Sequence, residues 1–167
     1  MAIITLNNNS LSSVTSLPAA ISTGKVLQVV STHKSDAFTT TSTSFTDITG
    51  LSVTITPSSS SNKILVSYDI TGSEDVDANR FYLRLLRGAT VIGGGDSAGS
   101  RFSGIGGFGT HNNTIQSGNV SGTFLDSPST TSATTYTIEM KTDAGAMHIN
   151  RDGSTNGGVT IAQEVRA

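Results

Sequence analysis

Two neighbouring stretches of the chain alternate apolar and polar residues most regularly, at 48–55 and 64–70. A period of two places the apolar side chains of a strand on one face. The linking segment contains Pro57 followed by a run of serines, where the missing proline donor and the serine hydroxyls favour a turn. We therefore predict two antiparallel strands. The residues expected to face the core are Leu51, Val53, Ile55, Tyr68 and either Ile64 or Leu65.

Similar alternation recurs in shorter stretches separated by Gly, Asp and Pro. In 80–87, Phe81, Leu83 and Leu85 fall on one face, and Arg80, Tyr82, Arg84 and Leu86 on the other. Gly88 and Ala89 predict a turn into a short strand at 90–92. Further strands are predicted at 25–34, 38–46 (strand or loop), 114–124, 135–141, 146–150 and 159–165. No stretch convincingly predicts a helix, so we expect an all-β fold, an antiparallel jelly roll or β-sandwich of about eight strands.

Two segments depart from this pattern. Residues 93–109 are rich in glycine, and the entropic cost of ordering glycine predicts a long loop carrying Phe102, Ile105 and Phe108. Residues 1–24 contain too many apolar residues for a solvated tail, and Pro18 and many hydroxyl residues disfavour a helix. We predict an extended N-terminal docking arm at 1–24, followed by one domain at 25–167. The arm residues expected to bind a partner are Ile3, Ile4, Leu6, Leu11, Val14, Leu17 and Ile21.

Composition narrows the possible partners. The chain has 167 residues, which suits one domain, and its 10 basic and 12 acidic residues form no basic block, so nucleic acid is not an expected partner. The absence of cysteine excludes disulfides, thiolate metal sites and cysteine nucleophiles. No secretory signal or membrane span is apparent, so we expect synthesis in a cytoplasm and no membrane partner. Only 35% of the residues are hydrophobic, which favours stabilisation by assembly into a homotrimer.

One motif suggests an enzyme. Residues 95–99 match the G-x-S-x-G pattern around a nucleophilic serine, here Ser97, with His33 upstream. The candidate acidic partners are Asp69, Asp75 and Asp77. A nucleophile elbow needs a strand-to-helix turn, whereas this match lies between glycines and has Ala98 next to the serine. We therefore interpret it as a glycine- and serine-rich loop, and we expect no catalytic residue.

The remaining motifs are weaker. Residues 104–109 match G-x-G-x-x-G but do not open a predicted helix, which argues against a dinucleotide cofactor. The run from Asp75 to Asn79 begins like a calcium loop but then has Arg80 where an EF-hand needs glycine, leaving at most a weak carboxylate site. His33, His111 and His148 are too far apart to form a spacing motif, so we expect no metal site unless the fold or a threefold axis assembles one. Tyr68, Tyr82 and Tyr136 are expected to be partly buried strand residues.

Several phrases resemble small structural proteins of tailed bacteriophages, particularly those of cyanobacteria and marine bacteria. These phrases lie at 4–14, 24–30, 41–57, 63–66, 85–93 and 126–128 with 136–137, and together they touch most of the chain. They are strand and turn patterns without site residues. The resemblance implies a jelly-roll protein located in the virion.

Three functions follow, in order of preference. The first is a non-enzymatic capsid decoration or cement protein, a homotrimer attached through its arm to the major capsid protein or another virion protein. The arm supports this reading because 24 residues reach at most ~80 Å, which is short for a fibre shaft. The second is a tail-fibre or appendage knob that binds host surface glycans, and the third is a hydrolase using Ser97.

Overall fold

The protein is described by a computed structural model over residues 26–74, 80–109, 117–151 and 163–166. This part of the chain contains no helix, and therefore none long and apolar enough to cross a membrane. It is all-β, as the sequence predicts. The strands are β1 (Ser31–Lys34), β2 (Phe38–Thr40), β3 (Thr46–Ile55), β4 (Ile64–Glu74), β5 (Arg80–Arg87), β6 (Thr90–Ile92), β7 (Gly106–Gly109), β8 (Ser117–Asp126), β9 (Thr134–Thr142), β10 (Met147–Ile149) and β11 (Gln163–Arg166).

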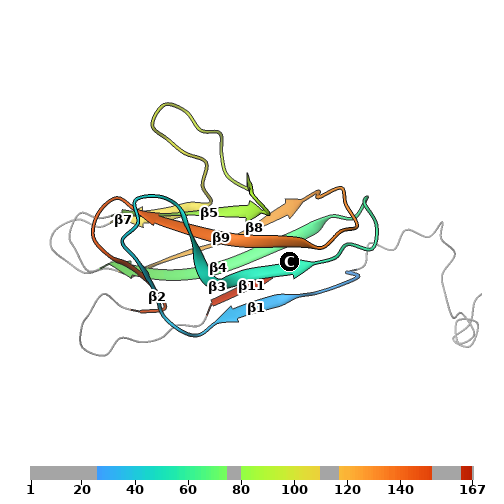
Figure 1. The fold of residues 1–167 in the computed structure, drawn as a ribbon, viewed down its shortest axis with the longest axis horizontal. Coiled ribbons are helices and arrows are strands. Elements are labelled where there is room, and N and C mark those ends of the chain that lie inside the picture. Colours follow the sequence, from blue (N-terminus) through green and yellow to red (C-terminus); the bar gives the residue numbers. More distant parts are fainter. Residues whose placement is uncertain (1–25, 75–79, 110–116, 152–162, 167) are drawn as a thin grey trace, which may run out of the picture.

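The strands form two antiparallel sheets, called A and B here. In sheet A, β4 pairs with β8 on one side and with β11 and then β10 on the other. Strand β11 pairs in turn with β1, and β10 with β2. In sheet B the order is β3, β9, β5, and the far side of β5 pairs with β6 and β7. Strands of both sheets run along the long axis of the molecule (Figure 1).

This pairing is the topology of a jelly roll. Strands β1 and β2 lie one after the other in a single strand position, and so do β6 and β7, and β10 and β11. Counting each pair once leaves eight positions, which is the number that the sequence predicts. Numbered along the chain, they are ordered 1-8-3-6 in sheet A and 2-7-4-5 in sheet B. Nearly every connection therefore crosses between the sheets, as in a double-sheet jelly roll.

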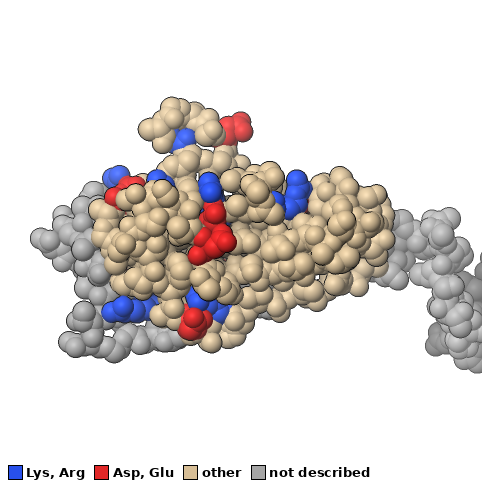
Figure 2. All heavy atoms as spheres, viewed as in Figure 1, with Lys and Arg blue, Asp and Glu red and all other residues tan. Residues whose placement is uncertain are grey.

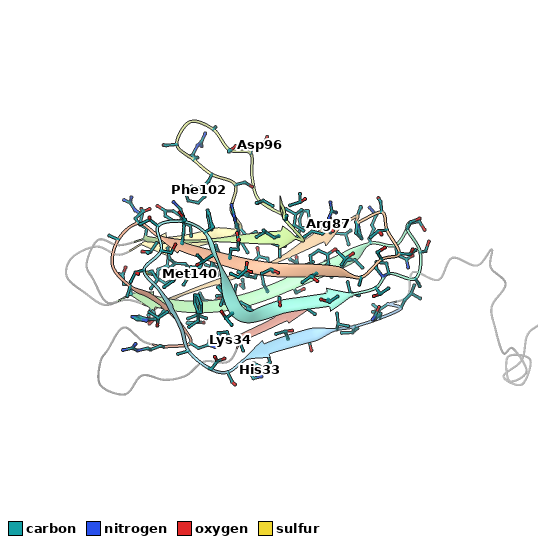
Figure 3. All side chains as sticks on the ribbon, in the orientation of Figure 1. His33, Lys34, Arg87, Asp96, Phe102 and Met140 are labelled. Atoms are coloured by element: carbon teal, nitrogen blue, oxygen red, sulfur yellow. The ribbon has the colours of Figure 1, made fainter. Side chains whose placement is uncertain are left out.

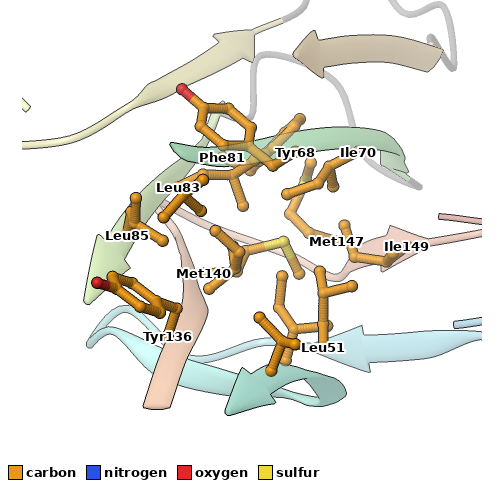
Figure 4. Packing of buried hydrophobic residues seen from close by; sticks show 14 of the residues in the cluster. Leu51, Tyr68, Ile70, Phe81, Leu83, Leu85, Tyr136, Met140, Met147 and Ile149 are labelled. Atoms are coloured by element: carbon orange, nitrogen blue, oxygen red, sulfur yellow. The ribbon is translucent and has the colours of Figure 1, made fainter. Parts of the chain in front are cut away.

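The core lies between the sheets and is filled by alternate residues of their inner faces. Met140 of β9 and Met147 of β10 meet at its centre, surrounded by aliphatic and aromatic side chains from both sheets (Figure 4). The predicted inward residues Phe81, Leu83 and Leu85 are fully buried. Burial of the whole core provides the main favourable contribution to the free energy of folding, because hydrophobic burial is the dominant favourable term.

A buried polar network joins the two sheets at one end. Arg87 of β5 donates through Nη1 to Asp126 Oδ1 (2.8 Å) and Oδ2 (3.1 Å), and the hydroxyl of Tyr136 in β9 donates to Asp126 Oδ2 (2.6 Å). Asp126 ends β8 in sheet A, whereas its partners belong to sheet B. Burial, followed by the neighbouring Asp126 carboxylate, raises the pKa of Tyr136, so its hydroxyl keeps the proton that it donates.

The structure corrects several sequence-based expectations. Strands β3 and β4 do not pair with each other: they belong to different sheets, and residues 56–63 arch between the layers. Of the two residues that the sequence left open, Ile64 faces the core and Leu65 does not. Leu86, expected on the outer face, is buried as well. The predicted strand at 25–34 is shorter, because only Ser31–Lys34 pairs with another strand.

The segment at 93–109 is only partly a loop. Residues 106–109 form β7, which pairs with Arg80–Leu83 of β5. The glycines permit this pairing, since a Cβ added to Gly107 would lie 2.2 Å from the Phe81 carbonyl oxygen. The preceding residues project from the body of the sandwich on the sheet B side (Figure 1, yellow-green).

Candidate functional site

An apolar groove lies at the end of the sandwich where residues 56–63 connect the sheets; we call it the basal groove. Its volume is about 760 Å³. Residues 26–29, which precede β1, form one wall, and the first residues of β4 together with Leu125 of β8 form the other. The lining residues are Val26, Leu27, Gln28, Val29, Ile55, Pro57, Ser58, Asn62, Lys63, Ile64, Leu65, Ser67 and Leu125.

The walls of the basal groove expose large apolar side chains. Leu65 and Leu125 are 54% and 55% exposed, and they lie opposite each other in the β4–β8 pairing. Val26, Leu27 and Val29 are 78%, 60% and 68% exposed. These five residues account for all but Phe102 of the large exposed hydrophobic side chains in the described part of the chain. Contiguous exposed apolar surface of this kind marks an interaction site.

Sequence reasoning did not identify these groove residues as a site. A signal for two of them was present, because Leu65 and Leu125 occupy the outward phase of their strands, which otherwise carries mainly Ser, Thr, Asp and Asn. Their proximity depends on the β4–β8 register, in which Leu65 faces Leu125. Periodicity gives the face of a strand but not its partner, so this pair could not be found from the sequence.

A second cluster lies on the outer face of sheet B, where Lys141 is surrounded by aromatic rings. Its Nζ lies 4.3 Å from the ring centroid of Phe102, 5.1 Å from that of Tyr82 and 5.7 Å from that of Phe45. The rings of Phe45 and Tyr82 both meet Phe102 edge to face. Because Phe102 belongs to the projecting segment (Figure 3), these contacts attach that segment to sheet B.

Ionic contacts complete the sheet B cluster. Arg84 forms an ion pair with Glu139 and lies over the Phe45 ring at 4.2 Å. The Tyr82 hydroxyl donates to Asp143 Oδ2 at 2.8 Å. Burial and then the Asp143 carboxylate raise the pKa of Tyr82. The cations of the cluster thus contact its own aromatic rings and carboxylates. Phe102, which is 37% exposed, is the most exposed large apolar side chain in the cluster.

The candidate catalytic residues are not assembled. Ser97 lies in the projecting segment, beside the isolated bridge between Ala98 and Arg101. His33 lies on β1 in sheet A, and Figure 3 shows it on the opposite side of the molecule from Asp96, the neighbour of Ser97. Asp69, on β4, accepts a hydrogen bond from Asn119. Asp75 and Asp77 lie outside the described residues.

The described residues also bring together no group of three His, Asp or Glu side chains that could hold a metal ion. His148 is buried, and its Nδ1 is hydrogen-bonded to Thr39 Oγ1 at 2.8 Å. His111 and the whole run from Asp75 to Asn79 lie outside the described residues. The glycine motif at 104–109 leads into β7 and not into a helix, so it lacks the geometry of a dinucleotide site.

The predicted tyrosine positions agree with the structure. Tyr68 and Tyr136 are buried, and Tyr82 is half-buried, which confirms that these tyrosines are at least partly buried. Charged side chains of both signs are few and intermixed on the face shown in Figure 2, as the composition suggests. The predicted arm residues lie outside the described residues, and the described chain begins at Val26, in the wall of the basal groove.

No family model matches this chain, and no curated protein shows significant similarity to it. Two solved structures share similarity in fold. One is the structure of infectious bursal disease virus Gx strain, with 9% sequence identity and a TM-score of 0.43. The other is a mutant VP2 protein of the same virus in derived T=1 particles, with 11% identity and a TM-score of 0.42. Each match covers 83% of this chain, which spans 35% of the length of either viral chain.

Proposed function

We propose that this protein is a non-enzymatic structural subunit of a virus particle, a capsid decoration or cement protein anchored through residues 1–24. The observation that carries this proposal is the exposed apolar groove at the point where the arm joins the sandwich. A jelly roll with such a groove, and without an assembled catalytic or metal cluster among its described residues, suits attachment to other proteins. The resemblance to phage structural proteins supports the same role.

The arm gives the proposal a chemical basis. Its apolar residues can add a short strand and side-chain anchors to a partner surface, where main-chain hydrogen bonds provide affinity and alternate side chains fill pockets. Burying two such side chains stabilises a contact by roughly 3 to 6 kcal/mol before ordering costs. Several arms on one oligomer bind together through their effective concentration. The expected partner is the major capsid protein or another virion protein.

Deletion of residues 2–20 tests the anchoring role. The truncated protein should keep its strand content by circular dichroism but fail to bind purified particles that lack the protein. Asn8→Ser is a matched control, because it changes a polar arm residue and should bind like the unaltered chain. Full decoration by the truncated protein would refute the arm as the anchor.

The number of copies per particle separates capsid decoration from a tail appendage. Hundreds of copies indicate capsid decoration, and a few to a few dozen indicate a tail appendage.

The projecting segment favours a second candidate function, a tail-fibre or appendage knob that binds host glycans. It holds the exposed carboxylate of Asp96 away from the sandwich and carries the partly exposed ring of Phe102 near its base (Figure 3), and sugar sites combine an apolar ring with polar groups. Binding of the protein to host cells that Phe102→Ala abolishes and Ser100→Ala preserves would support this role. Equal cell binding by both variants, or none by the unaltered chain, would exclude it.

A further inference from the structure

Sheet A lacks one strand at the basal groove. Strands β1 and β4 both pair with β11, so one strand position separates them. This pairing ends where Arg166 lies opposite Ser31 on one side and Ser67 on the other. Beyond that level, residues 26–30 extend the line of β1, and Ile64–Val66 begin β4. The groove lies between these two segments, and no described residue occupies the strand position there.

The backbone on both sides of this position is available for pairing. Residues 64–66 pair with β8, and no described strand pairs with their other side. In an antiparallel sheet, alternate residues direct their N–H and C=O groups to opposite sides, so part of this backbone faces the groove. Residues 26–30 belong to no described strand. An exposed strand edge with unpaired N–H and C=O groups is a template for pairing with another strand, so the groove favours an added strand.

The walls specify the side chains that such a strand needs. Ile55 and Ile64 line the groove from the core side, whereas Leu65 and Leu125 line it from the outer face of sheet A. A strand here would contact apolar surface with both of its faces. Strands buried on both faces consist of nearly continuous apolar residues instead of an alternating pattern.

Residues 3–6 of this chain, Ile-Ile-Thr-Leu, have that character. β-Branched residues fill three of the four positions, and none is proline. The later part of the arm is less suitable, because Pro18 cannot donate a hydrogen bond within a strand paired on both sides. We propose that the basal groove is a strand-binding site and that residues 3–6 of the same chain occupy it in the free subunit.

The connectivity favours the chain's own segment over that of a second copy. A strand antiparallel to both neighbours runs in the direction of β11, so its Leu6 end lies at the outer end of the groove, beside Val26. Residues 7–25, which are 19 residues, then join these two ends, and a flexible chain of that length has a root-mean-square span of roughly 24 Å. The resulting effective concentration is in the millimolar range, above the micromolar concentration of the arm of an unassociated second subunit in a dilute solution.

Occupancy of the groove does not depend on the proposed function. It would cover Leu65 and Leu125 in the free subunit, and it would keep Ile3 and Ile4 from solvent before assembly. If the arm also anchors the subunit to a particle, residues 3–6 must either leave the groove on attachment or contact the particle while they remain in the groove. Particle binding and groove occupancy are therefore measured separately.

Disulfide trapping tests the site directly, because the chain contains no cysteine of its own. Leu65→Cys is combined in turn with Ile3→Cys, Ile4→Cys, Thr5→Cys and Leu6→Cys in the full chain, and each purified variant is oxidised mildly at low micromolar concentration. A strand in the groove places alternate arm residues beside position 65, at separations that allow a disulfide. We expect intrachain cross-linking that alternates along the arm, several-fold above a control with Ser121→Cys. Ser121 is exposed on β8, four residues before Leu125.

Two outcomes would overturn the proposal. Interchain dimers as the main product would assign the strand to a second copy, and yields equal to the Ser121→Cys control would leave residues 3–6 outside the groove. Hydrogen exchange offers a readout without new cysteines. Deleting residues 3–6 should accelerate the exchange of amides in 26–30 at least about tenfold while leaving β9 unchanged. Unchanged exchange in 26–30 would also contradict occupancy.

Discussion

Loss of the Asp126 side chain should remove polar stabilisation that links the two sheets. It is buried and accepts hydrogen bonds from Arg87 and Tyr136. Because the Arg87 side chain is 30% exposed, its charge stays partly solvated, but the buried Tyr136 hydroxyl would lose its acceptor, at a cost of about 1–3 kcal/mol. We expect Asp126→Ala to lower the free energy of urea unfolding by about that amount. Asp47→Ala, at an exposed position, should change it by less than about 0.5 kcal/mol. Equal effects would show that the network contributes little.

Tyr136 should make the stability sensitive to high pH. Burial and the Asp126 carboxylate raise its pKa in the folded state, whereas an unfolded tyrosine titrates near pH 10. The folded state therefore holds the proton more tightly. This contribution is complete below about pH 10 and is lost as the pH rises toward the folded pKa. The urea midpoint should fall as the pH rises above about 10, and less steeply in Tyr136→Phe. The same fall in both proteins would exclude Tyr136 as its source.

At the level of single residues, the sequence predicted the core better than the surface sites. Phe81, Leu83 and Leu85 are buried as their period of two requires. The choice between Ile64 and Leu65 stayed open because both are apolar and adjacent, and only the packing of β4 decides it. Which residues contact Lys141 and Asp126 also depends on which strands pair. The groove and the cluster on sheet B were therefore not predictable from the sequence.

The glycines of β7 allow a strand where the composition predicted a loop. Gly107 lies against the backbone of β5, and an added Cβ would stand 2.2 Å from the Phe81 carbonyl oxygen. Because backbone atoms cannot move aside cheaply, we expect Gly107→Ala to destabilise the protein by about 1–3 kcal/mol and to accelerate amide exchange in 106–109. Gly95→Ala is the matched control, since an added Cβ there meets nothing within 4 Å. Equal urea midpoints for the two variants would contradict a requirement for glycine at Gly107.

At the level of elements, the strands were predictable but their partners were not. The alternating patterns located β3, β4, β5 and β9 within a few residues of their observed bounds. Nothing in those patterns distinguishes a hairpin from an arch between two sheets, because both require an apolar face and a polar turn. The β3–β4 connection is an arch, and the pairing of β4 with β8 joins segments far apart in the sequence. Such pairings between distant segments determine the topology of the fold.

For the whole molecule, the number of predicted strands was enough to predict a jelly roll or β-sandwich, because few architectures accommodate about eight short antiparallel strands. The location of the groove was not predictable. The groove arises because β11 stops at Arg166, whereas the segments on its two sides, 26–30 and 64–66, extend further. The ends of strands are the least certain part of a sequence-based prediction. The role of residues 1–24 stays a proposal, since they lie outside the described residues.

The exposed apolar surface of the sandwich predicts an oligomer. The chain combines a hydrophobic content of 35% with no cysteine, and it exposes Leu27, Val29 and Phe102 in addition to the facing leucines of the groove. Residues 3–6 can cover only part of this surface, so we expect association into a homotrimer of three 17.2 kDa chains. Sedimentation at micromolar concentration should give about three times the chain mass. Deletion of residues 2–20 should preserve the trimer if the sandwich forms the contacts. A stable, folded monomer of the full chain in the same experiment would refute the trimer, and dissociation only after the deletion would transfer the contact to the arm.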